Sequence, residues 1–401
     1  MITYISNGSI TSVSGIKADG VFCGLKKYKK DLAIIISDYP SNAGGTFTLN
    51  KVQAAPLLVS KSILEKDQPV RAILINSGNA NACTGEKGFN NALEVQKYCA
   101  EKYGLDPNEV LISSTGVIGV QLNTEKVMNG IDNLQPSYEI GSSNAAAEAI
   151  LTTDTYAKSL ACKVQLSEGE VTIGGICKGS GMIMPNMATM LAFIATDAAM
   201  PKSLVQIAIS EAVNKSFNRI SVDGDTSTND MVVLMANGAS GISINGGSKD
   251  YKLFEFALND LCKKMAQEII KDGEGATKFV SVIVNSAKSE SDADIAAKAI
   301  VNSPLVKTAI NGADANWGRI LSAVGNSGIN FSPEKVSIKI GEYALLKRGY
   351  DAAFDESIAK QILLNKEIEI TVDLNEGDSS TNWWTCDFSQ EYIKINANYR
   401  S

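Results

Sequence analysis

The sequence predicts a mixed α/β fold, and three observations indicate it. Short β-branched, apolar runs alternate with stretches whose apolar residues recur at helical spacing. Hydrophobic residues make up 44% of the 401 positions and charged residues 20%, which is typical of a soluble globular protein rather than a disordered one. No internal repeat or low-complexity linker separates the two halves of the chain. A chain of this length forms one large domain or two of ordinary size.

In the first half of the chain, three apolar runs predict buried strands. They are rich in β-branched residues, are bounded by polar or glycine-rich turns, and cover residues 32–37, 71–76 and 110–113. Two further stretches predict helices, one over 89–102 and one over 145–151. In the first of these, Ala92, Val95 and Cys99 recur at helical spacing.

The second half of the chain repeats this mixture. Helices are expected over 204–217 and 252–270, and strands over 279–284 and 336–340. The predicted class is therefore mixed α/β along the whole chain.

The charge balance excludes several classes of partner. The chain carries a formal net charge of -7, whereas neutralising phosphates requires a basic patch. The longest basic block, 26–30, is typical of a solvated loop or strand edge, so no nucleic acid or membrane partner is expected. The first residues show no signal peptide, and no apolar run approaches the roughly 20 residues of a membrane-spanning helix. We therefore expect a cytoplasmic protein.

The cysteines and glycines do not form a recognisable cofactor site. Seven cysteines are scattered without a Cys-x-x-Cys pair, and the chain contains no histidine, so no metal is expected. The thiols are interpreted as buried or inert in a reducing compartment. The glycine-rich run from Gly179 fails the dinucleotide pattern at its third glycine, and no phosphate-binding P-loop occurs.

Five polar or glycine-rich stretches are candidates for a functional site. Four of them follow an apolar strand or helix, where ligands bind in open α/β proteins, but tight turns explain their composition equally well; they cover 76–85, 113–119, 272–278 and 312–319. The fifth, 223–230, begins like a calcium loop but has Thr228 in place of the glycine and Leu234 in place of the glutamate. It is interpreted as structural, with short polar side chains holding a turn beside a site.

The run from Lys178 to Met190 is rich in small residues and leads to the hydroxyl of Thr189. A hydroxyl is a poor nucleophile until a base takes its proton, and histidine, the usual base, is absent. One remaining route is for the threonine to become an N-terminus, whose α-amine, with an ordinary pKa of about 8, acts as the base. The segment therefore predicts self-cleavage before Thr189, followed by use of that threonine as the nucleophile.

This run resembles the self-cleaving segment of the ornithine acetyltransferases of arginine biosynthesis, also called glutamate N-acetyltransferases. The resemblance covers essentially the whole chain through ordered motifs: NKVQAAP (50–56), NSGNANA (76–82), SSTG (113–116), LTTDT (151–155), SVDGDTSTND (221–230), GEGATK (273–278), NWGR (316–319) and INANY (395–399). It implies a DmpA-like layered sandwich of sheets covered by helices. It also implies an α chain of residues 1–188, which carries the oxyanion hole, and a β chain of residues 189–401, assembled as an α2β2 heterotetramer.

The resemblance further implies the chemistry. Thr189 would attack the carbonyl of Ala188 and so release the two chains. It would then take an acetyl group from N2-acetylornithine and pass it to glutamate, which is ping-pong acyl transfer without a cofactor. Some members of the family also accept acetyl-CoA as a donor. The sequence leaves that second activity open, and acetyl recycling is the more secure expectation.

The remaining site residues are also assigned by the resemblance. The Thr115 hydroxyl and the Gly116 backbone N–H would stabilise the oxyanion, each donor being worth about 2.7–4 kcal/mol. Lys178 would line the substrate pocket, where its charge holds a substrate carboxylate or biases the nearby amine toward neutrality. The other substrate-binding positions are Thr152, Glu274, Asn396 and Ser401. Thr153 stands next to Thr152 and is an alternative for its role. Without the resemblance, Thr115–Gly116 would be a strand-end turn and Lys178 a surface lysine.

Two departures from the family pattern stand near the end of the chain. Ser401 replaces a usual threonine, but its hydroxyl survives, so binding is expected to survive as well. The stretch 382–386 contains two tryptophans and is bulkier than expected, which puts the local packing in doubt without touching a catalytic residue.

Two other functions compete with acetyl transfer. A self-processing aminopeptidase or amidohydrolase on the same scaffold would mature by the same cut and pass its acyl group to water. The amino-acid-binding set that includes Lys178 and Glu274 favours the transferase instead. A non-catalytic α/β binding protein would not be cut at all, and it leaves a threonine framed by small residues in a chain without histidine unexplained.

Overall fold

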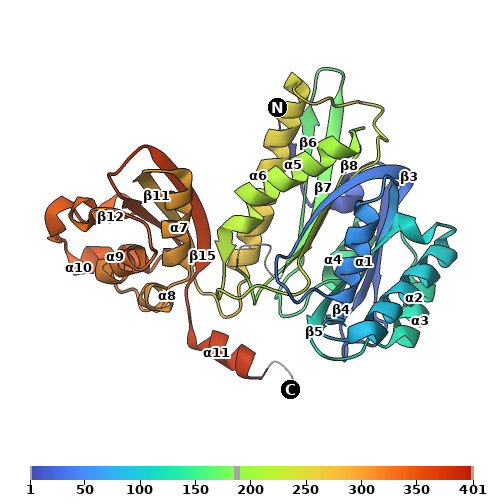
Figure 1. Ribbon diagram of the computed structural model, residues 1–401, viewed down its shortest axis with the longest axis horizontal. Helices are drawn as coiled ribbons and strands as arrows, with labels where there is room; N and C mark the ends of the chain where they lie inside the picture. The colour runs from blue at the N-terminus through green and yellow to red at the C-terminus, as the bar shows by residue number, and fades with distance from the viewer. Residues whose placement is uncertain (1, 185–189, 399–401) are drawn as a thin grey trace. The chain divides into compact units, whose positions relative to one another are not determined.

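The computed structural model describes residues 2–184 and 190–398, and these form two compact units (Figure 1). The first unit comprises the chain up to residue 218 together with 225–269, and the second comprises 219–224 and the chain from 270 onward. The Ala188–Thr189 bond falls within the sequence span of the first unit. The predicted division into 1–188 and 189–401 therefore does not coincide with the unit boundary, and it stays a prediction.

The first unit is built on a nine-stranded sheet with the order β1–β6–β7–β8–β10–β3–β4–β5, in which β2 pairs with β3 off this path. Its strands are β1 (Ile2–Tyr4), β2 (Ile16–Val21), β3 (Leu32–Phe47), β4 (Val70–Asn79), β5 (Val110–Val117), β6 (Lys158–Gln165), β7 (Glu170–Lys178), β8 (Leu191–Thr196) and β10 (Met231–Ala236). The long strand β3 joins the sheet together, because its first half pairs with β2 and β4 and its last six residues pair with β10.

Six helices accompany this sheet among the residues described. They are α1 (Ala55–Leu64), α2 (Gly85–Tyr103), α3 (Thr124–Asn133), α4 (Ile140–Ala149), α5 (Lys202–Lys215) and α6 (Lys249–Lys271), the last running into the second unit. Helices α1, α2 and α3 pack in series beside β5, whereas α4 packs on β2 and α5 on β3 (Figure 1). The apolar β-branched faces of β3 and β4, including Ile34, Ile35 and Ile73, are fully buried in this core.

Two parallel strand pairs determine which residues meet. In the β4–β5 pair, Asn76 lies opposite Ser114 and Gly78 lies opposite Gly116. In the β8–β10 pair, Leu191 lies opposite Met231. The carboxyl ends of β4 and β5 therefore meet at one place, and the residues that precede β8 and β10 stand next to each other at another.

The second unit contains a six-stranded sheet with the order β13–β12–β14–β11–β15–β9. Its strands are β9 (Ile220–Ser221), β11 (Phe279–Ala287), β12 (Ser337–Ile340), β13 (Tyr343–Leu346), β14 (Glu367–Asp373) and β15 (Ser379–Cys386), and its helices are α7 (Glu290–Val301), α8 (Pro304–Asn311), α9 (Trp317–Gly325), α10 (Glu356–Leu363) and α11 (Gln390–Ala397). Helix α7 packs on β11 and β15. The two tryptophans of β15 are buried, and Trp383 Nε1 donates a hydrogen bond to Asp294 Oδ1 (2.9 Å), which shows how this bulky stretch packs.

The mixed α/β class is confirmed, and so is each predicted strand. The helix predicted over 145–151 begins earlier, at Ile140, and ends at Ala149. The helix predicted over 204–217 ends at Lys215, because Ser216 leaves helical geometry and its hydroxyl donates back to the Ala212 carbonyl (2.6 Å). Within the described ranges, no helix combines the length and apolar character that crossing a membrane requires.

Candidate active site

The predicted site residues divide into three groups. Thr115, Gly116, Thr152 and Lys178 belong to the first unit, and Glu274 and Asn396 belong to the second. Ala188, Thr189 and Ser401 lie outside the described residues. The geometry of the site is therefore built from the six described positions and their neighbours.

Glycine at position 116 allows two parallel strands to approach closely. Gly116 has a φ of 130°, and a Cβ atom added there would lie 2.4 Å from the carbonyl carbon of Gly78 and 2.6 Å from the amide nitrogen of Asn79. A side chain at this position would be strained and would also overlap β4. Thr115 lies beside it with its side chain buried. The close approach expected of this glycine is thus made to β4, and its role as an oxyanion donor stays a prediction.

Amide side chains hold the ends of β4 and β5 in place. Asn76 accepts a hydrogen bond from the Ser114 hydroxyl (2.5 Å) and donates to the carbonyl of Asn79 (2.9 Å). Asn229 donates to the carbonyls of Ala80 (2.7 Å) and Ser114 (2.8 Å). The polar stretch that contains Asn229 therefore has the structural function predicted for it, and it acts on the strand end that carries Thr115.

Lys178 is at the centre of a buried charged cluster. It is the last residue of β7 and is 1% exposed, so the interpretation as a surface lysine is wrong. Its Nζ donates to Thr152 Oγ1 (2.7 Å) and lies 3.6 Å from Asp154 Oδ2. Asp154 also accepts hydrogen bonds from Lys158 Nζ (2.9 Å) and from the Gly179 amide (2.7 Å). Two ammonium groups thus lie next to one carboxylate, and an ammonium group such as that of Lys178 suits an anionic ligand group.

Opposing effects act on the Asp154 carboxyl. Burial alone would raise its pKa, but the charges of Lys178 and Lys158 and the hydrogen bonds to Asp154 hold the pKa well below its ordinary value. Asp154 is therefore an anion over the whole neutral range. It compensates part of the positive charge and fixes the position of Lys178.

A third lysine, Lys26, interacts electrostatically with this cluster. Lys26 Nζ donates to the carbonyls of Leu151 (2.6 Å) and Lys30 (2.9 Å). Burial lowers the pKa of Lys26 to about 8, and the charge of Lys178 acts in the same direction, whereas Asp31 opposes it. Residues 27–29 of the basic block are exposed as predicted, whereas Lys30 is half-buried.

The contact with Lys178 distinguishes the two adjacent threonines. A Thr152→Val variant is expected to lose roughly 10–100-fold in kcat/KM for the acetyl donor, because a hydrogen bond to a charged group is worth about 1.5–3 kcal/mol. Thr153→Val is its matched control and is expected to stay within about threefold of wild type. Steady-state kinetics on both variants provide the measurement. A larger loss in Thr153→Val would assign the role to Thr153 instead.

Asp154 is also expected to affect stability in a pH-dependent way. Because its native pKa is depressed, its stabilisation is complete above the unfolded value of about 3.9 and is lost as pH falls through the native pKa. Urea unfolding at pH 7 is expected to show Asp154→Asn destabilised by about 3–5 kcal/mol, since it leaves the buried ammonium group of Lys178 without this carboxylate. The difference should shrink below pH 4.

Asp38 provides the matched control for that experiment. It forms an ion pair with Lys17 at 2.7 Å, but both side chains are about one-third exposed to solvent. Asp38→Asn is therefore expected to change the unfolding free energy by no more than about 1 kcal/mol. Equal effects of the two variants would show that the buried cluster contributes nothing beyond a surface pair.

In the second unit, Glu274 and Asn396 are brought together. Asn396 Nδ2 on α11 donates to Glu274 Oε2 (2.8 Å). The loop that carries Glu274 lies against α11, because Gly275 has a φ of 69° and a Cβ added to it would be 2.4 Å from the Tyr392 amide nitrogen. Two residues that are 122 positions apart in sequence therefore form one polar pair.

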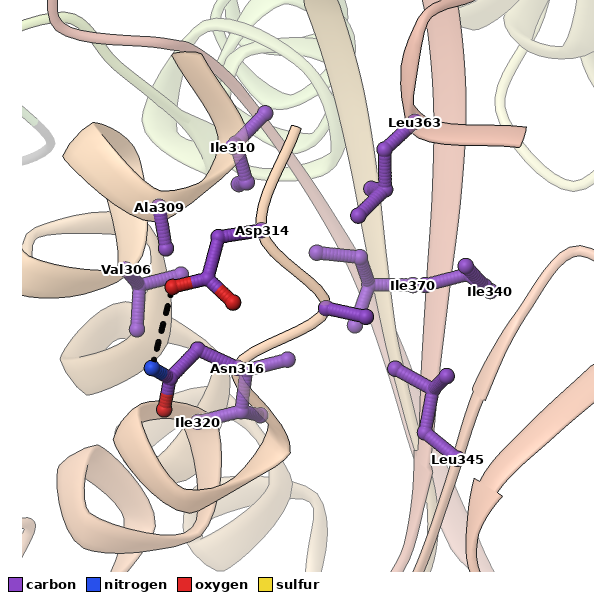
Figure 2. A pocket seen from close by; sticks show the side chains of 11 residues that line it. Val306, Ala309, Ile310, Asp314, Asn316, Ile320, Ile340, Leu345, Leu363 and Ile370 are labelled. Carbon is purple, nitrogen blue, oxygen red and sulfur yellow. Dashed lines mark hydrogen bonds between the residues drawn. The ribbon is translucent and has the colours of Figure 1, made fainter. Parts of the chain in front are cut away.

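The polar stretch 312–319 borders a pocket that is too small for a substrate. The pocket measures about 10 Å³, close to the space of one water molecule, and is lined mainly by apolar side chains (Figure 2). Asn316 caps α9 by accepting from the Arg319 amide (3.2 Å), and it donates to Asp314 (3.1 Å). These polar residues cap a helix and form a turn. Of the two interpretations of the stretch, a ligand site or a tight turn, these contacts favour the turn.

The thiols largely match their interpretation as inert. All seven cysteines are free, and five of them are buried. Burial raises the pKa of Cys99, Cys162 and Cys177 to about 12, so these thiols stay protonated at neutral pH. Cys83 departs from the expectation, since it is exposed.

Sequence reasoning missed several buried charged residues near the predicted ones. Asp154 and Lys158 accompany Lys178, and Asp230 accepts a hydrogen bond from the Met190 amide (3.1 Å). Asp387 accepts from the amides of residues 277 (2.8 Å) and 278 (2.9 Å) and so holds the loop of Glu274. Asp154 and Asp230 lie inside the motifs 151–155 and 221–230, so the sequence offered a signal for these two residues. Nothing in the sequence pointed to Asp387.

Comparison with known proteins identifies the family of the chain. The ArgJ family matches residues 17–401. The arginine biosynthesis bifunctional protein ArgJ of Caldanaerobacter subterraneus subsp. tengcongensis is 48% identical, with 99% of this chain and 100% of the relative covered. The protein of the same name from Bacillus licheniformis is 47% identical, with 99% and 97% covered. The crystal structure of arginine biosynthesis bifunctional protein ArgJ from Bacillus halodurans is 39% identical, covers 47% of this chain and 98% of its own, and has a TM-score of 0.45.

The relatives that match over the full length define the class of the protein: it is an enzyme, an acyltransferase, and its fold is mixed α/β. The match over nearly the whole length is more specific than that class. The chain belongs to the ArgJ family.

Proposed function

We propose that this chain is a glutamate N-acetyltransferase of arginine biosynthesis, which moves an acetyl group from N2-acetylornithine to glutamate. Membership of the ArgJ family and the names of its relatives support the pathway. The observation that carries the proposal is the buried cluster of Lys178, Thr152 and Asp154. The ammonium group of Lys178 suits a substrate carboxylate or an oxyanion that develops during acyl transfer.

The proposed nucleophile is Thr189, first on its own chain and then on the substrate. Its hydroxyl attacks the Ala188 carbonyl, and hydrolysis of the resulting ester releases chains 1–188 and 189–401. In turnover the same hydroxyl attacks the acetyl carbon of N2-acetylornithine. The amide C–N bond breaks, and the α-amine of Thr189 passes the hydroxyl proton to the departing ornithine amine. The glutamate amine then attacks the acetyl ester, and the threonine oxygen regains a proton as it leaves.

The other proposed roles follow the resemblance. Thr115 and Gly116 donate to the oxyanion, which is supported by their fixed position at the carboxyl end of β5. Glu274 and Asn396 bind polar groups of the substrate; the carboxylate suits an ammonium, and the amide already contacts it. Ser401 completes this set. The same proposal includes an α2β2 heterotetramer and a cytoplasmic location.

Acetyl-CoA is proposed as a second donor. Both relatives are named bifunctional, which supports an additional activity in the family. Incubation with acetyl-CoA and glutamate is expected to release free thiol and form N-acetylglutamate. Absence of thiol release, with acetyl transfer from N2-acetylornithine intact, would leave this chain with the recycling activity alone.

The deciding experiment is the denatured intact mass of the purified protein after brief exposure to N2-acetylornithine. Two fragments that meet at Ala188/Thr189, the second heavier by one acetyl group, are the expected result. Two fragments that never carry acetyl and release acetate instead would favour the self-processing hydrolase. A single uncut chain would contradict the mechanism proposed above.

A further inference from the structure

We propose that Asp230 is a positioning residue for this reaction: its buried carboxyl group fixes the Met190 amide through one oxygen, a role that requires a hydrogen-bond acceptor but no negative charge. The proposal rests on the proposed function, because it takes Thr189, the neighbour of Met190 in the chain, as the nucleophile. The interactions and burial of Asp230 within the first unit are its basis.

The backbone brings Asp230 next to Met190. The two residues directly precede the paired parallel strands β10 and β8. The Met190 amide donates to Asp230 Oδ1 (3.1 Å), and the Met231 amide donates to the Met190 carbonyl (3.3 Å). The Thr48 amide donates to the carbonyl of Asp230 (3.1 Å), so its main chain is fixed as well. The Asp230 side chain thus accepts a hydrogen bond from the residue that follows the proposed nucleophile, Thr189, in the chain.

The second carboxyl oxygen of Asp230 is the unusual feature. Asp230 is fully buried, and among the residues that the structure describes its Oδ2 makes no hydrogen bond of ordinary geometry, although the Thr48 and Ser227 side chains interact with the carboxyl group. A buried polar atom without a partner costs about 1–3 kcal/mol, and it costs more when the group is charged. Groups of this kind are uncommon in folded proteins and often have a functional role.

Burial disfavours the charged form of the carboxyl group. It raises the pKa of Asp230 well above the ordinary value, although the Met190 amide, the Thr48 and Ser227 side chains and the positive charge of Lys178 act in the opposite direction. When the group is protonated at Oδ2, Oδ1 remains a carbonyl acceptor for Met190. An asparagine has the same shape and the same pattern of one acceptor and one donor group, whereas an alanine has neither.

The first test compares Asp230→Asn with Asp230→Ala by intact mass. Asp230→Asn is expected to be cut at Ala188/Thr189 and to keep kcat/KM within about threefold of wild type. Asp230→Ala is expected to be cut at least tenfold more slowly. If asparagine fails as completely as alanine, an ionised carboxylate is required and the proposal is wrong. If alanine is cut as fast as wild type, Asp230 positions nothing.

Asp197 supplies a matched control at the opposite end of β8. It directly follows that strand, is 5% exposed, accepts a hydrogen bond from the Thr172 amide (2.7 Å), and has a pKa that burial raises. Asp197→Ala is expected to be cut normally. Equal slowing by Asp197→Ala and Asp230→Ala would mean that any loss of support for β8 has this effect, which contradicts a specific role.

The second test does not depend on activity or on cleavage. Since the native pKa of Asp230 is raised, its stabilising contribution is complete below the unfolded value of about 3.9 and is lost as pH rises toward the native value. An asparagine at this position does not titrate, so its contribution to stability does not fall as pH rises. The urea midpoint of Asp230→Asn, measured relative to that of wild type, should therefore rise between pH 4 and pH 9. A difference that stays constant above pH 5 would show an ionised Asp230, whereas an uncut wild-type chain would contradict only the proposed function.

Discussion

A Thr189→Ala variant is expected to purify as one uncut chain of 42.6 kDa and to show no measurable acetyl transfer. The change removes the hydroxyl that attacks Ala188 and, with it, the proposed route by which a base arises at this position in a chain without histidine. Loss of the nucleophile in a comparable hydroxyl enzyme lowers kcat by about 10⁶, which is below ordinary detection. Intact mass and an ornithine-release assay provide the two readouts.

A Thr189→Ser variant distinguishes loss of the hydroxyl nucleophile from loss of side-chain packing. Serine keeps the hydroxyl and, after cleavage, presents an α-amine in the same way, so both cleavage and transfer should persist at reduced rates. Full activity in an uncut Thr189→Ala chain would show that the nucleophile lies elsewhere. The self-cleavage hypothesis would fail with it.

The fold was predictable where local pattern and tertiary packing agree. The apolar runs within β3, β4 and β5 are rich in β-branched residues and buried except at Arg71, so their composition and their environment both favour a strand. Helix α2 was found nearly whole, because its apolar residues share one face and Gly104, with a φ of 66°, ends it. The sheet order was not predictable, since pairing between β8 and β10 depends on residues 40 positions apart.

The site was predictable by residue type but not by environment. Lys178 was identified from its motif, yet its burial depends on Asp154 and Lys158, which meet it only through the antiparallel pairing of β6 and β7. Lys26 shows the same limit in the opposite direction: it belongs to an exposed basic block, but its side chain is half-buried against the carbonyl of Leu151. Charge patterns report solvated faces on average and do not resolve a single side chain that turns inward.

Gly116→Ala is expected to have the second-largest effect. The new Cβ would lie 2.4 Å from the backbone of Gly78, and backbone atoms of a paired strand have no flexible end that can move aside. The β4–β5 pair must therefore shift at the point where Thr115 is held. Displacing an oxyanion donor is expected to lower kcat by about 10²–10³-fold, and relief of the overlap should also reduce the unfolding free energy by more than backbone strain alone.

Gly119 provides the control that separates steric overlap from backbone strain. It also has a positive φ, 80°, but a Cβ added there meets nothing within 4 Å. Gly119→Ala is therefore expected to lower the unfolding free energy only through the strain of a left-handed backbone, by about 1–2 kcal/mol. It should leave acetyl transfer near the wild-type rate. Urea unfolding and steady-state kinetics on the two variants separate strain from overlap. If Gly116→Ala matches Gly119→Ala in both measurements, the close approach of β5 to β4 is not what fixes Thr115, and the proposed oxyanion donors lose their structural support.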